Sequence, residues 1–491
     1  NKTAVAPTAS ISIICGGSSP GIEPIAANVY AHKTLSGTFT VRNRHLKILL
    51  QEKNQDNDEV WLSILSNRGS VQHLDFLSEH EKDVLAGNTG TLGDKMAMEL
   101  VVESAKVLGA NSLIPVESGH VDGCLYHGDS GVLYCEKLAS GGTQVKIPTT
   151  TNVGALNLSQ IKQTHLSKDK REMAYRLMIA HQEMGCRPTW TCAPYQAGAR
   201  PGFGQQVAWG ESNAVAFTNS ILGARTNRYG DFLDVACAIS ARAPYYGLHL
   251  SKNRVAKLML DVSNLSKKLL REDAFFSILG SMIGKLAGET ICVVHGLPNN
   301  AQEDQLKALC AGAASTGSVG LVHLSGLTPE APDTQTALDY QQPQEIVTIT
   351  REMVIEARDS LSTPNINQID CVALGSPHFS SDECRALLSL ANKKHFKVPV
   401  YVCTGRHTMV NLEQDGTDND LKDLGVTFVI DTCVVVTPIL PNKPGTLMTN
   451  SAKFAHYTAG NTGYSPVFGS LTDCVKSAQS GKLTWDNLVW G

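Results

Sequence analysis

The sequence predicts an α/β protein of several domains, in which helices cover parallel sheets. Its 491 residues are enough for two to four domains and a large core. A hydrophobic content of 42% and a charged content of 18% are typical of a globular protein. Short apolar runs alternate repeatedly with stretches of helical spacing, and this alternation indicates layers built on parallel sheets.

The net charge and the cysteines narrow the class of protein. A formal net charge of -4 gives no reason to expect nucleic acid or a membrane surface as a partner. No apolar run reaches the ~18 residues of a membrane-spanning helix, and no secretory leader opens the chain. The 13 cysteines are odd in number and scattered, which favours reduced thiols, some of them metal ligands, over a disulfide framework. We therefore expect a cytoplasmic protein.

The first segment, residues 1–84, differs from the rest of the chain. Its motifs Pro7-Thr-Ala-Ser10, Asn28-Val-Tyr30 and Val71-Gln-His-Leu-Asp75 resemble the large subunit of ribonucleotide reductase, where the first loop helps to hold substrate phosphates. That family's Asn-x-Cys-x-Glu radical site and redox cysteine partners are missing here, and the segment is small for an independent domain. We expect a non-functional appendage, either a fusion or a gene-assembly artefact, with nucleotide binding as the alternative.

Helices and strands are expected to alternate from residue 85 to the end. Helical spacing predicts helices over 96–108, 170–184, 231–241, 274–288, 302–317 and 346–358. Apolar runs predict strands over 112–116, 289–295, 319–323, 371–374, 398–403 and 426–430. Residues 145–152 repeat the pattern of a strand followed by a polar loop, and residues 334–345 are expected to be a polar linker.

The polar loop over residues 117–129 follows a predicted strand, the position where open α/β sheets usually bind ligands. It contains His120, Asp122, Cys124 and His127, which could form a metal cluster. Because closely spaced side chains need not converge, we favour a catalytic or binding loop without metal.

The stretch around Cys192 is the densest in residues that bind metal, carboxylate or hydroxyl groups. Pro188 and Pro194 exclude a continuous helix, so Cys192 is expected on a rigid, irregular loop. Cys192, Cys371 and Cys433 each lie near the end of a predicted strand, and three converging thiolates could hold an iron–sulfur cluster with one iron open to substrate. No CxxC motif accompanies them, and a buried structural thiol is the alternative for Cys192.

Long motifs recur from about residue 78 onward. They are Ser118–Gly123, Pro148–Gly154, Gly185–Gln196, Trp209–Ala214, Asn219–Asp231, Gly375–His378, Asp431–Cys433 and Thr449–Lys453. By these motifs the chain is identified as a member of the aconitase X large-subunit family. The resemblance implies an aconitase-like, multi-domain α/β fold with parallel-sheet layers around a central cleft. We expect its two parts to span residues 85–330 and 331–491.

The resemblance implies a hydro-lyase that removes water from a small hydroxy acid. Members of the family dehydrate cis-3-hydroxy-L-proline or, in archaea, mevalonate 5-phosphate. We favour cis-3-hydroxy-L-proline, giving Δ1-pyrroline-2-carboxylate, because Ser376 and the segment Cys124–Asp129 are closer to the bacterial hydroxyproline type. Mevalonate 5-phosphate is the alternative substrate. A fused remnant that binds a partner and turns nothing over is the alternative of another class.

The family's three iron ligands fall on Cys192, Ser376 and Cys433. Ser376 replaces the cysteine of the 4Fe-4S members, and a serine hydroxyl is a weaker iron ligand than a thiolate. The cofactor is therefore expected to be iron or an iron–sulfur cluster, with 2Fe-2S, 3Fe-4S and 4Fe-4S forms left open.

Catalytic and substrate-binding residues are expected within these motifs. The catalytic candidates are His120, Asp122, Ser451 and Lys453. The substrate-binding candidates are Thr149, Thr150, Asn152, Glu211, Ser212, Asn213, Arg225, Asn227 and Arg228. Arg225, Arg228 and Lys453 suit a substrate carboxylate, with structural ion pairs as the alternative. In the family a serine of the separate small subunit, a swivelling domain, is the base, so this chain alone is expected to be inactive or nearly so.

Overall fold

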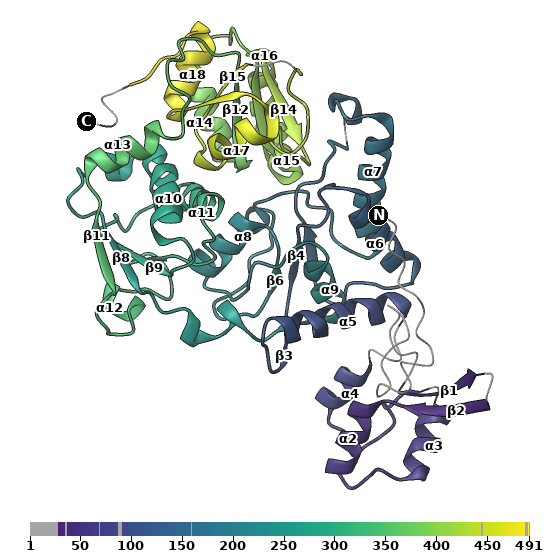
Figure 1. Cartoon of the computed structure of the whole chain (residues 1–491). Coiled ribbons are helices and arrows are strands. Elements are labelled where there is room, and N and C mark those ends of the chain that lie inside the picture. Colours follow the sequence, from purple (N-terminus) through teal and green to yellow (C-terminus); the bar gives the residue numbers. More distant parts are fainter. Residues whose placement is uncertain are drawn as a thin grey trace, which may run out of the picture.

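The described residues form a small amino-terminal module and a main body that contains three parallel sheets (Figure 1). The computed structural model describes residues 28–34, 37–67, 69–86, 91–158, 160–442, 445–486 and 490. Within these ranges, no helix combines the length and the apolar character needed to cross a membrane.

The module precedes the three sheets and has its own core. Its elements are β1 (Val29–Thr34), β2 (Gly37–Arg42), α2 (Arg44–Glu52), α3 (Asp58–Ser66) and α4 (Glu79–Ala86). β1 and β2 form an antiparallel hairpin, and Asn43 and Asn57 cap the two helices that follow. The buried side chains are Val29, Leu46, Leu50, Trp61, Ile64, Val71, Leu74, Leu77 and Leu85. The predicted phosphate loop Pro7–Ser10 lies outside the described residues.

The first sheet of the main body has three short parallel strands in the order β5-β4-β6. They are β4 (Gly119–Val121), β5 (Thr149–Thr151) and β6 (Ala208–Trp209). The helices around them are α5 (Leu92–Val107), α6 (Asp129–Ser140), α7 (Lys168–Glu183) and α9 (Leu233–Ser240). Their apolar faces share one buried cluster with the strands, as the helical spacing of the sequence predicts.

Two expectations for this region need correction. The predicted strand over 112–116 forms β3 (Leu113–Pro115), but β3 pairs antiparallel with β7 (Arg242–Pro244) and stays outside the parallel sheet. The predicted loop over 117–129 contains the central strand β4. Its three residues are too few to show a strand period, and only tertiary burial makes them a strand.

The second sheet has four parallel strands in the order β10-β9-β8-β11. They are β8 (Leu258–Asp261), β9 (Cys292–His295), β10 (His323–Leu324) and β11 (Glu345–Thr348), with α10 (Asp273–Ala287), α11 (Glu303–Thr316), α12 (Thr334–Ala337) and α13 (Arg351–Asp359). Helices α10 and α11 lie so close that a Cβ atom at Gly280 would be 2.2 Å from the carbonyl oxygen of Leu309. The predicted helix over 346–358 is wrong at its start, because its first residues pair with β8 as the strand β11 and only α13 is helical. The expected division at residue 330 falls inside this sheet.

The third sheet has five parallel strands in the order β14-β13-β12-β15-β16. They are β12 (Cys371–Phe379), β13 (Val400–Thr404), β14 (Val426–Ile430), β15 (Thr446–Thr449) and β16 (Ser465–Phe468). The helices on its faces are α14 (Ser381–Ala391), α15 (Arg406–Asp415), α16 (Thr417–Asp423), α17 (Ala452–Thr462) and α18 (Leu471–Ser480). An irregularity in β12 between Leu374 and Phe379 carries the Ser376–His378 segment out of the regular register.

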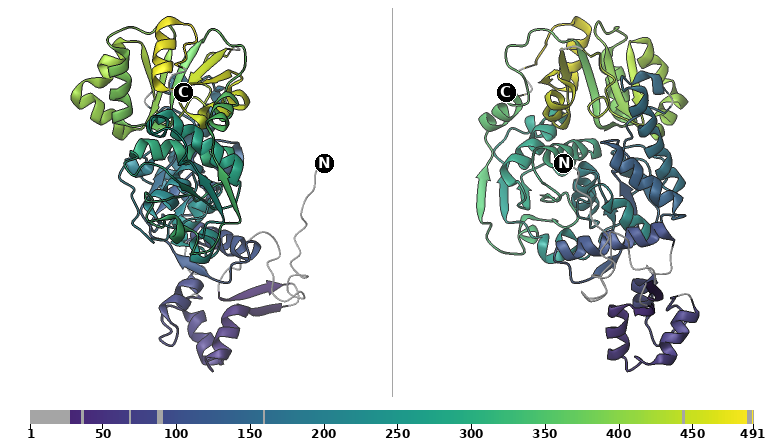
Figure 2. Two further views of the ribbon diagram at one scale, coloured as in Figure 1. Left: turned by 90° about the vertical axis from the view of Figure 1, so that its left-hand side faces the viewer. Right: turned by 45° about the vertical axis from the view of Figure 1, so that its right-hand side comes forward.

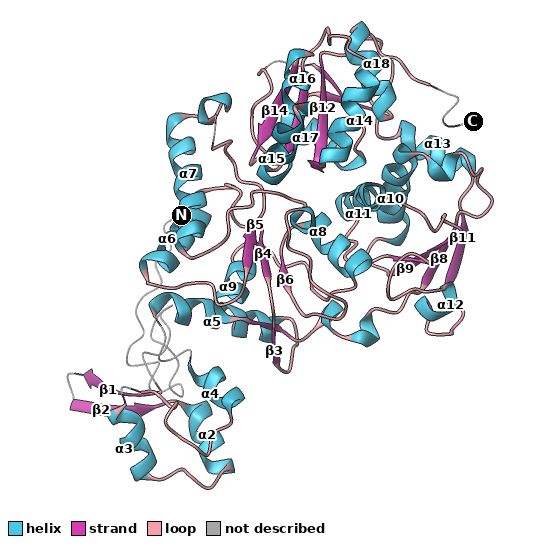
Figure 3. Ribbon diagram, turned by 180° about the vertical axis from the view of Figure 1, so that it is seen from behind, coloured by secondary structure: helices cyan, strands magenta, loops and turns pink. Residues whose placement is uncertain are grey.

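The third sheet lies beside the first two, at the end of the molecule away from the amino-terminal module (Figures 2 and 3). The loops that follow the strands of the first and third sheets meet each other. The N–H of Gly154, after β5, donates to the carbonyl oxygen of Asp431, after β14, at 2.8 Å. The carboxyl-terminal edges of the two parallel sheets therefore meet, and such edges are the usual ligand positions in α/β folds.

Candidate functional site

Three polar side chains converge where the strands of the first sheet end. Asp122 follows β4, Asn152 follows β5 and Glu211 lies two residues after β6. The amide nitrogen of Asn152 donates to Asp122 Oδ1 and, at 2.9 Å, to Glu211 Oε2. Neighbouring parallel strands end at the same edge of a sheet. The order β5-β4-β6 therefore brings the carboxyl groups of Asp122 and Glu211 to the amide of Asn152.

Lys453 reaches the same group from the third sheet. It lies in the first turn of α17, which Ser451 caps by accepting the N–H of Phe454 at 3.1 Å. The Lys453 ammonium is 2.7 Å from Glu211 Oε1 and 2.6 Å from Asn213 Oδ1. The site is therefore shared between the two sheets.

The protonation states of these groups follow from their surroundings. Burial and the nearby Glu211 charge raise the pKa of Asp122 to about 8. Burial opposes ionisation of Glu211 as well, but the Lys453 ammonium outweighs it and holds the pKa of Glu211 at about 2. At neutral pH the site therefore contains a protonated Asp122 carboxyl beside a Glu211 carboxylate paired with Lys453.

His120, in the middle of β4 and two residues before Asp122, is fully buried. Its Nδ1 is 2.9 Å from the Thr150 hydroxyl, and its ring contacts Trp209 with centroids 5.4 Å apart. Burial lowers the pKa of His120 to about 3, so the imidazole is neutral. Within the described residues, His120 Nε2 and Asn152 Oδ1 are buried without a hydrogen-bond partner. Two such atoms are free to bind polar groups of a ligand.

Two cysteine thiols lie next to this polar group. The Cys192 sulfur accepts the N–H of His378 at 3.3 Å, and the Cys192 carbonyl oxygen accepts from Asn213 Nδ2 at 2.7 Å. Cys433 lies close enough for an electrostatic interaction with Cys192. A hydrogen bond from the Cys403 thiol lowers the pKa of Cys433, whereas burial raises the pKa of Cys192 to about 12.

The third predicted iron ligand is different in kind. Ser376 is buried, and its carbonyl oxygen accepts the hydroxyl of Ser451. Across the described ranges, no three His, Cys, Asp or Glu side chains converge as a metal site would require. The contacts therefore link the thiols of Cys192 and Cys433, with the Cys403 thiol bonded to Cys433, and Ser376 as the third iron ligand stays a prediction.

Comparisons with known proteins agree with this architecture. Family models described as the first, second and third domains of aconitase X match residues 76–252, 256–359 and 369–480. The chain belongs to the aconitase X family. A model of the ribonucleotide reductase barrel domain matches residues 1–103, which overlap the start of the aconitase X match.

Individual relatives support the aconitase X assignment. A cis-3-hydroxy-L-proline dehydratase from Pseudomonas aeruginosa is 36% identical over 83% of this chain and 70% of its own length. A phosphomevalonate dehydratase large subunit from Methanothermobacter thermautotrophicus is 33% identical over 82% of this chain and 98% of its own length. The crystal structure of holo aconitase X from Thermococcus kodakaraensis superposes with a TM-score of 0.72 at 30% identity, covering 82% of this chain and 99% of that one. The predicted family and fold class are confirmed.

The remaining substrate-binding candidates occupy different places in the aconitase X fold. Ser212, at the start of α8 (Ser212–Phe217), donates to Glu211 Oε1 at 3.2 Å and so lies in the site. Thr149 and Thr150 line a separate cavity of about 570 Å³ at the amino-terminal end of β4 and β5.

Two further candidates lie in a network apart from Asp122 and Glu211. Arg225 donates to the Ser251 hydroxyl at 2.7 Å and lies 3.7 Å from Glu330. Asn227 accepts the N–H of Leu248 at 2.8 Å. Arg228 is exposed, and its backbone forms an isolated β-bridge with that of Trp209, next to the site. Substrate binding by Asn227 and Arg228 stays a prediction, and for Arg225 these contacts favour the alternative of a structural ion pair.

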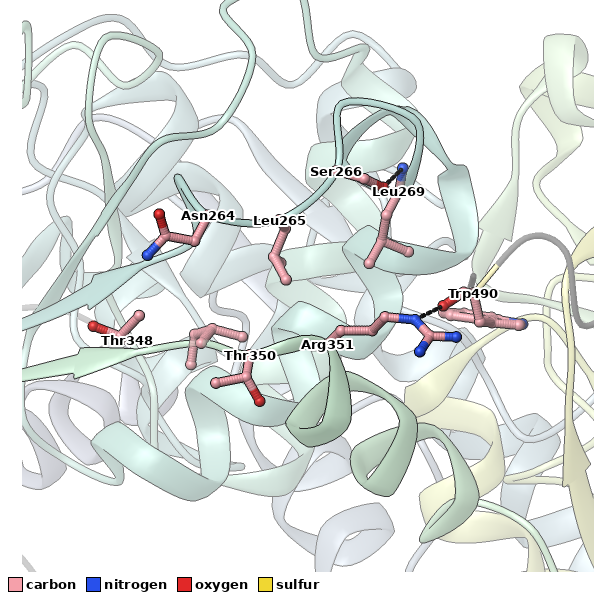
Figure 4. A pocket seen from close by; sticks show the side chains of 9 residues that line it. Asn264, Leu265, Ser266, Leu269, Thr348, Thr350, Arg351 and Trp490 are labelled. Carbon is pink, nitrogen blue, oxygen red and sulfur yellow. Dashed lines mark hydrogen bonds between the residues drawn. The ribbon is translucent and has the colours of Figure 1, made fainter.

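A second cavity, of about 370 Å³, lies near the carboxyl-terminal ends of β8 and β11 (Figure 4). Its lining includes the buried apolar residues Leu265, Leu269 and Ile349, and the Arg351 side chain donates to the carbonyl oxygen of Trp490 at 2.7 Å. No residue predicted for the site lines it.

Sequence reasoning missed three residues that shape the site: Asp234, His378 and Cys403. Asp234 Oδ2 accepts the N–H groups of Asp122 at 2.6 Å and Gly123 at 3.2 Å, so it fixes the turn after β4. A signal for it existed, because Asp234 is the one charged residue of the otherwise apolar helix α9. Cys403 is the last residue of the predicted strand over 398–403, but no motif in the sequence around it indicates a contact with Cys433.

Proposed function

We propose that this chain is the large subunit of a hydro-lyase of the aconitase X type, with cis-3-hydroxy-L-proline as its substrate and Δ1-pyrroline-2-carboxylate as the product. One observation carries the proposal: a protonated Asp122, a Glu211–Lys453 ion pair and the thiols of Cys192 and Cys433 meet at one edge of two sheets. Two hydroxyproline dehydratases with 36% and 38% identity to this chain support the substrate.

The two thiols fit as ligands of an iron centre, and the hydroxyl of the buried Ser376 would be the third ligand. Cys192 and Cys433 would hold the iron, and the hydrogen bond from His378 to Cys192 is of the kind that stabilises an iron-bound thiolate. With Ser376 as the third ligand, a cubane held by three protein thiolates does not fit the predicted ligands Cys192, Ser376 and Cys433. When bound, the iron would supply Lewis acidity to the departing hydroxyl group.

The remaining residues have roles that their protonation states suggest. Asp122 keeps its proton at neutral pH and can deliver it to the departing hydroxyl, since hydroxide is a poor leaving group. Lys453 and the exposed Arg228 can bind the substrate carboxylate. The Ser451 hydroxyl is engaged by the Ser376 carbonyl and the N–H of Phe454, which favours a base from elsewhere. A small subunit supplied in trans would bring it.

A second substrate is favoured by a different observation. The chain matches 98% of the length of the archaeal phosphomevalonate dehydratase large subunit, against 70% of the hydroxyproline dehydratase. Mevalonate 5-phosphate is therefore the alternative substrate.

The test combines the purified chain with a swivelling-domain small subunit and ferrous iron under anaerobic conditions. Both substrates are then assayed for loss of water. We expect turnover of cis-3-hydroxy-L-proline only with the small subunit present. Turnover of mevalonate 5-phosphate alone contradicts the substrate, and a chain that binds no iron and shows no activity with a matched small subunit is a non-catalytic remnant.

A further inference from the structure

Lys307 is a buried lysine between the second and third sheets, outside the group that carries the proposed function. It belongs to α11, and only 2% of its side chain is exposed. The ammonium lies 2.8 Å from Asp304 Oδ1 and 2.5 Å from Glu383 Oε2, and it donates to the carbonyl oxygen of His378 at 3.1 Å. An ammonium group has three donors, so this set of partners satisfies it.

Asp304 extends the cluster to the loop that carries Cys192. Asp304 accepts from Gln196 Nε2 at 2.9 Å and from the Ser380 hydroxyl at 2.6 Å. Gln196 ends the short helical turn that follows Cys192, and Ser380 follows β12. A buried ion cluster is a weak source of stability, so its value lies in the arrangement that it enforces.

His378 transmits this arrangement to the sulfur. Its N–H donates to Cys192 Sγ at 3.3 Å, while Lys307 holds its carbonyl oxygen. Its ring lies between the Thr191 hydroxyl, 3.1 Å from Nδ1, and the carbonyl oxygen of Thr432, 3.1 Å from Nε2. Thr191 and Thr432 each precede one of the two cysteines of the site, so His378 contacts both ligand loops.

We propose that Lys307 is a positioning residue that holds His378 in place, so that the N–H of His378 reaches the Cys192 sulfur and the iron centre takes its working geometry. This inference rests on the proposed function, because it takes Cys192 as an iron ligand. Hydrogen bonds to ligand sulfurs and the partners behind them set metal affinity and reduction potential. A merely structural Lys307 would affect stability alone.

The test uses the full chain with ferrous iron and sulfide under anaerobic conditions. The variant is Lys307→Met/Glu383→Gln, which removes one positive and one negative charge together. We expect iron affinity to fall about tenfold or more and the thiolate-to-iron absorption bands to shift. The milder Gln196→Leu variant cuts only the link to the Cys192 loop and is expected to change the iron centre in the same direction.

Arg254→Met/Glu330→Gln is the matched control. It removes another buried ion pair, 2.7 Å long, whose arginine is 3% exposed and does not bond to either cysteine loop. The control is expected to keep the wild-type iron affinity and spectrum. Unchanged iron affinity and spectrum in a folded Lys307→Met/Glu383→Gln chain overturn this inference alone. A wild-type chain that takes up no iron overturns the proposed iron site together with it.

Discussion

Lys453 and Glu211 form a largely buried ion pair, with Nζ 2.7 Å from Oε1, although 242 residues separate them in the sequence. The pair joins the first turn of α17 in the third sheet to the end of β6 in the first. It also keeps Glu211 ionised, which leaves the proton of the carboxyl pair on Asp122. One contact between sheets therefore decides the charge of the site.

Replacing Lys453 by Met should damage both stability and catalysis. Glu211 would be left buried without a counter-charge, and breaking a buried pair costs about 3–5 kcal/mol of unfolding free energy. Denaturant titration measures that loss, and steady-state assays with the small subunit measure the activity. Lys106→Met removes a surface pair with Glu103 and should change stability by less than about 1 kcal/mol. Equal stability of the two variants would contradict the role of the buried pair.

The Asp122→Asn variant tests the proton donor. Because the pKa of Asp122 is raised to about 8, the carboxyl group is protonated below that pH and ionised above it. Wild-type kcat/KM should therefore fall as the pH rises through about 8. The asparagine variant should lose about 100-fold or more in rate together with that alkaline limb. A variant that keeps the limb would show that another group titrates there.

Cysteine-to-serine variants test the iron ligands. Cys433→Ser and Cys192→Ser should each lose bound iron, since an alkoxide or hydroxyl oxygen binds iron less well than a thiolate. Cys474→Ser is the control, because Cys474 is equally buried but lies in the core on the far face of the third sheet. Iron analysis after gel filtration decides. Full iron content in Cys433→Ser would remove that residue from the ligand set.

The two arginines near β6 should behave differently. Arg228 is exposed beside Trp209, so Arg228→Met should raise KM with little effect on stability. Arg225 is held by Ser251 and Glu330, so Arg225→Met should lower the melting temperature and leave KM close to that of the wild type. A large rise in KM for Arg225→Met would place that residue at the substrate after all.

A chain that starts at residue 88 tests the amino-terminal module. The module buries its apolar side chains within itself, so its removal should leave iron binding and activity of the remaining chain unchanged. Calorimetry with a nucleoside diphosphate is expected to show no binding to the full chain. Loss of iron binding on truncation would show that the module supports the aconitase X part.

Much of the architecture could be predicted from local patterns. The helices at 96–108, 170–184 and 302–317 were readable because their apolar spacing matches the faces that pack in α5, α7 and α11. Strands β13 and β14 could be predicted as well, since both lie in largely apolar runs of the sequence. Strand β4 and the strand β11 at the edge of the second sheet were not, because their partners, and not their own residues, make them strands.

The sequence by itself determined the family, the α/β layers and the identity of the side chains that can bind metal or substrate or transfer protons. Only the tertiary structure decided which of them act together. Glu211 pairs with Lys453, Cys433 accepts a hydrogen bond from Cys403, and Arg225 lies beside Glu330. These contacts form because the edges of parallel sheets bring together loops that are far apart in the chain. The tertiary structure also decided the protonation states. Burial and neighbouring charges raise the pKa of Asp122 and lower that of Glu211, and no local motif specifies either effect.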